Sequence, residues 1–200
     1  MISSKAMGYM LIMGLVGFAV MFFSFFMQGN QEGSTGVVEW AAASKDWENV
    51  GMVRMLALFS NLIFVTGFIS WARSINNSSS AITIGSTFAL MSIVLLWVSF
   101  ISHVAGYETA AGNTTAALGL IELGNMAGWF SGLLITLSFF LIGLSSYRQK
   151  VGMPALNVLL AIAGLVGAIA NFVWWVFFMG GFGIGLLILA IIGLKKIKDD

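Results

Sequence analysis

Cysteine is absent from this 200-residue chain, and histidine and proline occur only once each. Without thiols the chain cannot form disulfides, thiolate metal sites or a thiol nucleophile. One histidine and a few carboxylates are too few ligands for a haem or a multi-metal redox centre built by this chain alone. We therefore expect neither a metal nor a cofactor.

Charged residues are also scarce, at 8% of the chain, whereas soluble domains carry about 25%. Hydrophobic residues make up 59%. A core of this size cannot hide so many apolar side chains, so lipid must be the solvent for much of the surface. The net charge of +1 gives no reason to expect a nucleic acid partner.

The apolar stretches predict an all-α fold, because a helix needs about 20 apolar residues to cross about 30 Å of hydrocarbon. No cleavage site follows the first stretch, so we expect it to be retained. The last two stretches are short and closely joined, and one long span with a re-entrant segment is the alternative. We predict a polytopic bundle of six transmembrane helices in one domain, 1–200, with helices at about 7–27, 51–71, 81–103, 118–147, 156–175 and 179–194.

Residues 28–50 form the longest polar segment and the predicted first outer loop. The beginning of this loop is rich in glycine, which is typical of irregular structure. Further on, Val37, Trp40, Trp47 and Val50 fall near one helical face. This spacing indicates a short interfacial helix with tryptophans at headgroup depth. An ordered loop with two interfacial anchors explains the pattern equally well.

Basic residues set the predicted orientation, because they favour cytoplasmic loops. With the N-terminus inside, only Lys45 and Arg54 fall on the outer half. Both termini are then cytoplasmic in a multi-pass protein of the cell membrane. The inner side collects seven of the nine basic residues: Lys5, Arg73, Arg148, Lys150, Lys195, Lys196 and Lys198.

A polar cluster is predicted near the outer ends of four helices, where ionisable residues inside a membrane segment are costly and usually face the protein interior. We expect Arg54 and Glu122 to lie within salt-bridge reach. Three interpretations are open: a structural ion pair, a pocket for a small polar or anionic ligand, or a proton relay through His103 and Glu122. The five residues of the predicted cluster are Arg54, His103, Glu122, Asn125 and Asn171.

Glycines at four-residue spacing indicate close helix packing, because they let two backbones approach. The rows either pack helices of this chain together or contact another subunit. Because Gly128 is central in its row, we expect Gly128→Leu to disrupt packing more than Gly185→Leu. The helix-packing glycines are Gly124, Gly128, Gly132, Gly164, Gly167, Gly181 and Gly185.

The sequence carries no P-loop, no HExxH and no dinucleotide-binding glycine motif. The pattern of apolar stretches and short polar loops is similar to that of six-helix prokaryotic membrane proteins. This resemblance implies nothing about mechanism. We predict a non-enzymatic accessory or packing subunit of a larger membrane assembly, in contact with lipids and with other membrane subunits or a second copy. The alternative is a small transporter or ligand-binding membrane protein that uses the outer polar cluster. A transporter would require a polar path to both sides of the membrane.

Overall fold

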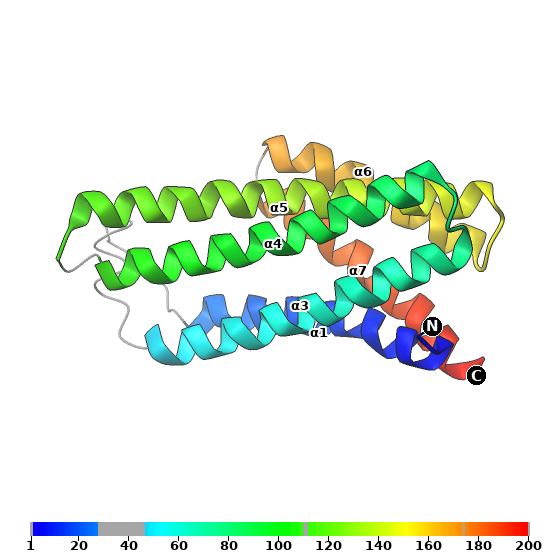
Figure 1. Cartoon of the computed structure of the whole chain (residues 1–200), viewed down its shortest axis with the longest axis horizontal. Helices are drawn as coiled ribbons and strands as arrows, with labels where there is room; N and C mark the ends of the chain where they lie inside the picture. The colour runs from blue at the N-terminus through cyan, green and yellow to red at the C-terminus, as the bar shows by residue number, and fades with distance from the viewer. Residues whose placement is uncertain (1, 28–46, 110–111, 174, 200) are drawn as a thin grey trace.

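The protein is all-helical in the computed structural model, which describes residues 2–27, 47–109, 112–173 and 175–199 (Figure 1). This part of the chain contains no strand. Its helices are α1 (Ser4–Met27), α3 (Trp47–Ile75), α4 (Ser80–Thr109), α5 (Thr114–Arg148), α6 (Pro154–Val173) and α7 (Trp175–Lys198).

All six of these helices are long and apolar enough to cross a membrane. The predicted fold class is confirmed, and the chain is an integral, multi-pass membrane protein whose spanning helices contact lipid. The predicted interfacial helix falls mainly on residues 28–46, which lie outside the described residues. Residues 47–50 belong to the first turn of α3 rather than to a separate helix.

Local sequence signals explain where the helices begin and end. Asn113 caps the start of α5, its side-chain oxygen accepting a hydrogen bond from the backbone N–H of Ala116 at 3.0 Å. The turn from α5 to α6 has positive φ at Lys150 (54°) and Gly152 (69°). Pro154 then opens α6, where its missing N–H removes no helical hydrogen bond.

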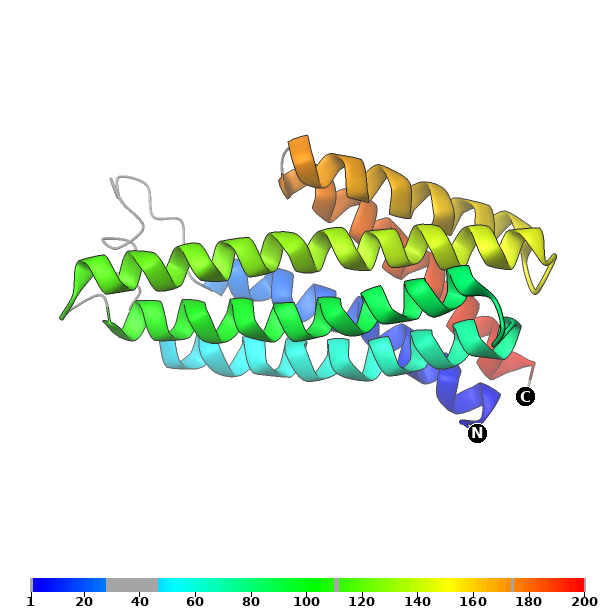
Figure 2. The ribbon, with the colours of Figure 1, turned by 45° about the horizontal axis from the view of Figure 1, so that its top comes forward.

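The helices form a ring in which each one packs against its neighbour in the order α1, α3, α4, α5, α6, α7 and back to α1. The α4–α5 pair is the most extensive contact, and the α3–α4 contact is the slightest of the ring (Figure 2). Phe139 of α5 lies at the centre, with its ring edge-on to Phe64 and Phe68 of α3 and stacked on Phe182 of α7. These rings close the middle of the bundle.

The two ends of the bundle differ in charge. We call the end that holds both termini and the α3–α4 and α5–α6 turns the basic end, and the opposite one the distal end (Figure 1). The basic end carries Lys5, Arg73, Arg148, Lys150, Lys195, Lys196 and Lys198. At the distal end α4 and α5 run well past the turn that joins α6 to α7 (Figures 1 and 2).

Helix lengths locate the membrane surface at the distal end. The 20 residues of α6 extend over about 30 Å, the thickness of the hydrocarbon layer. Trp129 of α5 is hydrogen-bonded to Asn171 in the last turn of α6, so the two residues lie at the same level. The part of α5 before Trp129 therefore reaches beyond the hydrocarbon when α6 just spans it.

Candidate functional site

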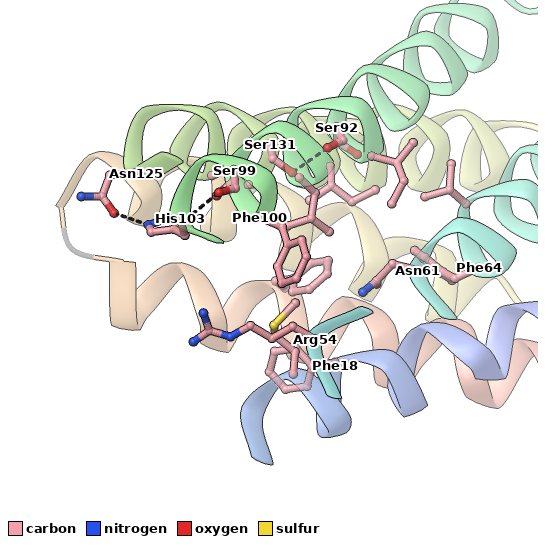
Figure 3. Close-up of a pocket in the computed structure, with 18 of the residues that line it drawn as sticks. Phe18, Arg54, Asn61, Phe64, Ser92, Ser99, Phe100, His103, Asn125 and Ser131 are labelled. Atoms are coloured by element: carbon pink, nitrogen blue, oxygen red, sulfur yellow. Dashed lines mark hydrogen bonds between the residues drawn. The ribbon is translucent and has the colours of Figure 1, made fainter. Parts of the chain in front are cut away.

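A cavity of about 520 Å³ lies inside the distal half of the bundle. Its walls come from α1, α3, α4 and α5, and Phe182 of α7 closes one side (Figure 3). On α4 the lining runs from Ser92 to Tyr107, a length of about 22 Å at about 1.5 Å per residue. The cavity is therefore long and narrow, with its axis along the helices.

The distal part of the cavity is polar. Arg54 of α3 lines it with a side chain that is only 6% exposed. The side chains of Arg54 and Tyr107 are joined by a hydrogen bond. Arg54 lies in the distal part of α3, 19 residues before Arg73 at the basic end, which is about 28 Å along the helix. This position allows a buried cation to face the membrane surface instead of the apolar centre.

His103 connects α4 to α5 on the opposite wall. Its Nδ1 lies 2.7 Å from the backbone carbonyl oxygen of Ser99, which can only accept, so Nδ1 carries a proton. Its Nε2 lies 3.0 Å from the side-chain oxygen of Asn125 (Figure 3). Which atom donates in the contact between His103 and Asn125 depends on the tautomer of the ring and the orientation of the amide.

Deeper in the cavity the walls become apolar and the hydroxyl groups are already bonded. Ser131 donates to the backbone oxygen of Ser92 at 2.7 Å, and the Ser92 hydroxyl donates to Ala89 at 2.8 Å. Asn61 donates to Ala57 at 2.9 Å within its own helix. The remaining lining toward the basic end includes Phe64, Val65, Ile93, Leu96, Ile135 and Phe182.

Of the five residues in the predicted cluster, the structure brings three together around the cavity: Arg54, His103 and Asn125. Glu122 is exposed and does not line it. No ion pair joins Arg54 to Glu122 in the described part of the chain, so the expected pairing is wrong. The face of α5 that lines the cavity passes through Ile121 and Asn125, and Glu122 is turned about 100° away from Ile121 around the helix.

Glu122 lies in the distal part of α5. It is 26 residues from Arg148 at the basic end, which is about 39 Å along the helix and more than the thickness of the hydrocarbon. Where Arg148 lies at one surface of the hydrocarbon, the exposed carboxylate of Glu122 can reach water or headgroups without a protein partner.

Asn171 performs a different task from the one predicted. It donates its side-chain N–H to the backbone oxygen of Trp129 at 3.1 Å, and the Trp129 indole donates to the backbone oxygen of Asn171 at 2.8 Å. These reciprocal bonds join α6 to α5. Asn171 does not line the cavity, so it belongs to helix packing.

Sequence reasoning missed Tyr107, Ser99 and Asn61 as lining residues. Tyr107 was expected in a loop because the predicted helix ended at residue 103, whereas α4 continues to Thr109. The sequence did contain a pattern that could have identified these residues. Side chains three or four positions apart lie on one face of a helix, and one such face of α4 lines the cavity. That face carries Ser92, Leu96, Ser99, His103 and Tyr107.

The glycines of α5 border the same cavity. A Cβ placed on Gly124 would lie 2.7 Å from Nδ1 of His103, so the glycine makes room for the imidazole ring. A Cβ on Gly128 would meet only the Ser99 side chain, at 3.0 Å from its hydroxyl oxygen. Gly132 is buried and lines the cavity. These contacts lie within the chain itself.

The glycines of α6 and α7 pack more closely. A Cβ on Gly164 would lie 2.6 Å from the backbone oxygen of Thr136, and one on Gly181 would lie 2.6 Å from the Cα of Gly167. A Cβ on Gly185 would lie 2.5 Å from the Phe139 ring. These contacts favour the opposite ranking from the one predicted, because Gly128 borders the cavity and Gly185 faces the buried ring at the bundle centre.

Comparison with known proteins gave no match. No family model, curated protein or solved structure matches the chain.

Proposed function

We propose that this integral membrane protein binds a small amphipathic molecule in the distal cavity. The observation that carries the proposal is the change along the lining, from Arg54, His103, Tyr107 and Asn125 at the distal end to aromatic and aliphatic walls inside. Ligand sites are typically concave, mostly apolar, and supplied with a few convergent polar groups. The volume of about 520 Å³ suits a small molecule.

Binding fits the lining better than transport or proton relay does. A transported polar substrate or a proton needs polar groups that continue to the other side of the membrane. Below Asn61, Phe64, Phe68 and Phe139 are fully buried and in contact with one another. The polar lining therefore does not continue through the bundle, because these three aromatic rings lie between the cavity and the basic end.

The charge distribution gives the orientation of the site. Because basic residues favour the cytoplasmic side, we place the basic end and both termini in the cytoplasm, with the cavity opening toward the outer surface of the cell membrane. A reporter fused after Asp200 is expected to read out as cytoplasmic. An external signal would place the cavity on the other side.

Ligand capture after gentle purification tests the proposal. The intact protein, extracted into a mild detergent and analysed by native mass spectrometry, is expected to carry one small molecule. Gly128→Leu places a side chain inside the narrow cavity and is expected to weaken or abolish that adduct, whereas Gly119→Leu on the same helix should keep it because a Cβ there meets nothing within 4 Å. An adduct that survives Gly128→Leu undiminished would count against the cavity as its site.

The accessory subunit favoured by the sequence is the second candidate. It is supported by exposed apolar side chains on the part of α5 that reaches past the hydrocarbon, namely Leu118, Leu123 and Met126. Apolar surface outside the bilayer is typical of a protein interface. Native purification would give a complex with other subunits if this role dominates, and the chain alone or with its ligand if it does not.

A further inference from the structure

We infer that the ligand is a single-chain lipid whose head group carries an anionic oxygen, a carboxylate or a phosphate, and whose chain lies along the apolar half of the cavity. This inference rests on the proposed function and narrows it to one chemical class. Three features support this inference: the charge at the distal end of the cavity, the shape of the cavity, and an apolar groove beside it on the lipid-facing surface.

The distal end selects a negative head group. Among the described lining residues Arg54 is the one side chain with a permanent charge, and none is a carboxylate. A guanidinium binds carboxylates and phosphates through parallel N–H donors. Tyr107 and Ser99 supply hydroxyl groups nearby. Because Glu122 points away from this wall, no described acidic group there would favour a cationic head.

The interior selects an apolar chain. The cavity is drawn out over about 20 Å along the helices, and its volume of about 520 Å³ makes it narrow for that length. The Ser92 and Ser131 hydroxyls donate to backbone oxygens, so they offer no donor to a polar molecule. Phe64, Ile135 and Phe182 form the apolar walls. An extended hydrocarbon chain fits this space, whereas a small free anion would leave it unfilled.

A groove on the membrane side points to the bilayer as the source of the ligand. It lies between α3 and α4, the slightest contact of the helix ring, and Ile93 lines both this groove and the cavity. Edge-on packing of Phe59 against Trp97, with ring centroids 5.5 Å apart, bridges the two helices nearby. Only apolar residues line the groove: Leu62, Ile93, Val94, Trp97, Val98 and Ile101.

The test compares three single probes on the delipidated, full-length protein: oleate, oleyl alcohol and acetate. Oleate has both the charge and the chain, oleyl alcohol has the chain alone, and acetate has the charge alone. Native mass spectrometry and thermal stability measure binding. We expect one oleate per chain, bound about tenfold or more tightly than oleyl alcohol, because hydrogen bonds to a charged group are among the strongest polar contacts. Acetate should not stabilise the protein.

Arg54→Gln should bring the affinity for oleate down to that for oleyl alcohol. Arg73→Gln is the matched control, since Arg73 is exposed at the basic end of the same helix. If Arg54→Gln fails to fold, Gly128→Leu provides the second variant, because it obstructs the cavity without removing the charge. It should abolish the binding of both oleyl probes.

The outcomes separate the two proposals. Equal affinity for oleate and oleyl alcohol, both lost in Gly128→Leu, would overturn the anionic head group and keep the cavity as a binding site. Stabilisation by acetate without binding of oleate would overturn the lipid chain. Binding of a native molecule to the purified protein that neither oleyl probe displaces would also overturn the inference while leaving the proposed function. If no ligand of any kind binds in the cavity, both the proposed function and this inference are wrong.

Discussion

The α6–α7 hairpin and the α3–α4 pair are both built from apolar membrane helices, yet they pack in opposite ways. Gly164 and Gly181 bring α6 against α5 and α7 so closely that a single added carbon would meet backbone atoms at 2.6 Å. Between α3 and α4, Asn61, Ser99 and His103 face a cavity instead. Small residues at facing positions close the α6–α7 interface, while these side chains of α3 and α4 border open space.

Gly181→Leu is expected to have the largest effect, because the new side chain would overlap the backbone of Gly167. We expect destabilisation at or beyond the upper end of the about 1–3 kcal/mol typical of overpacking, with loss of folded protein in detergent. Gly180→Leu, one residue earlier, meets nothing within 4 Å and should behave like the parent chain. Similar melting temperatures for the two variants would show that the hairpin is not closed by this contact.

Gly185→Leu should be the next most harmful change, since its Cβ would strike the buried ring of Phe139. A loss of about 1–3 kcal/mol is expected. Gly128→Leu should cost less than Gly185→Leu, because its Cβ would meet only the Ser99 side chain at the edge of the cavity. Thermal unfolding of both variants in the same detergent decides the order, and a larger loss at Gly128 would mean that the cavity is smaller than described.

Asn171→Leu removes the side-chain half of the reciprocal bond with Trp129. Hydrogen bonds between membrane helices contribute about 0.6 kcal/mol on average, so a modest fall in thermal stability is expected. Ligand binding should be unchanged because Asn171 lies outside the cavity. If Asn171→Leu lowers the ligand affinity as much as Arg54→Gln does, Asn171 belongs to the binding site after all.

Glu122→Gln should have the smallest effect, within about 0.5 kcal/mol as for other exposed positions. A double-mutant cycle with Arg54→Gln should give no coupling, because the two side chains form no ion pair. A coupling energy above about 1 kcal/mol would restore the pairing expected from the sequence.

Hydropathy was sufficient to predict six spans and the all-α fold, because the requirement for about 20 apolar residues is strict in lipid. The same property could not predict the end of α4. Past the hydrocarbon a helix no longer needs apolar residues, so α4 continues through Tyr107 to Thr109 without a hydropathy signal. Tyr107 was missed for that reason.

The candidate site was predicted only in part. The sequence grouped Arg54, His103 and Asn125 near one end of the bundle, and all three line the cavity. The sequence could not show which way each side chain faces, because Ile121 and Glu122 are adjacent in the chain and yet have different surroundings. Phe182 reaches the cavity from α7, and no local pattern in the sequence connects it to α3 or α4.

The unequal lengths of the helices also determine which bilayers suit the protein. With 20 residues, α6 matches a hydrocarbon layer of about 30 Å and is fixed to α5 at its distal turn by Asn171 and Trp129. The longer α4 and α5 can accommodate a thicker membrane, but α6 cannot lengthen. A thick bilayer would have to thin beside α6 and α7 while it stayed relaxed beside α4, at a cost of fractions of a kcal/mol for each Å of mismatch. Membrane thickness is therefore a variable to which one side of this protein is sensitive and the other is not.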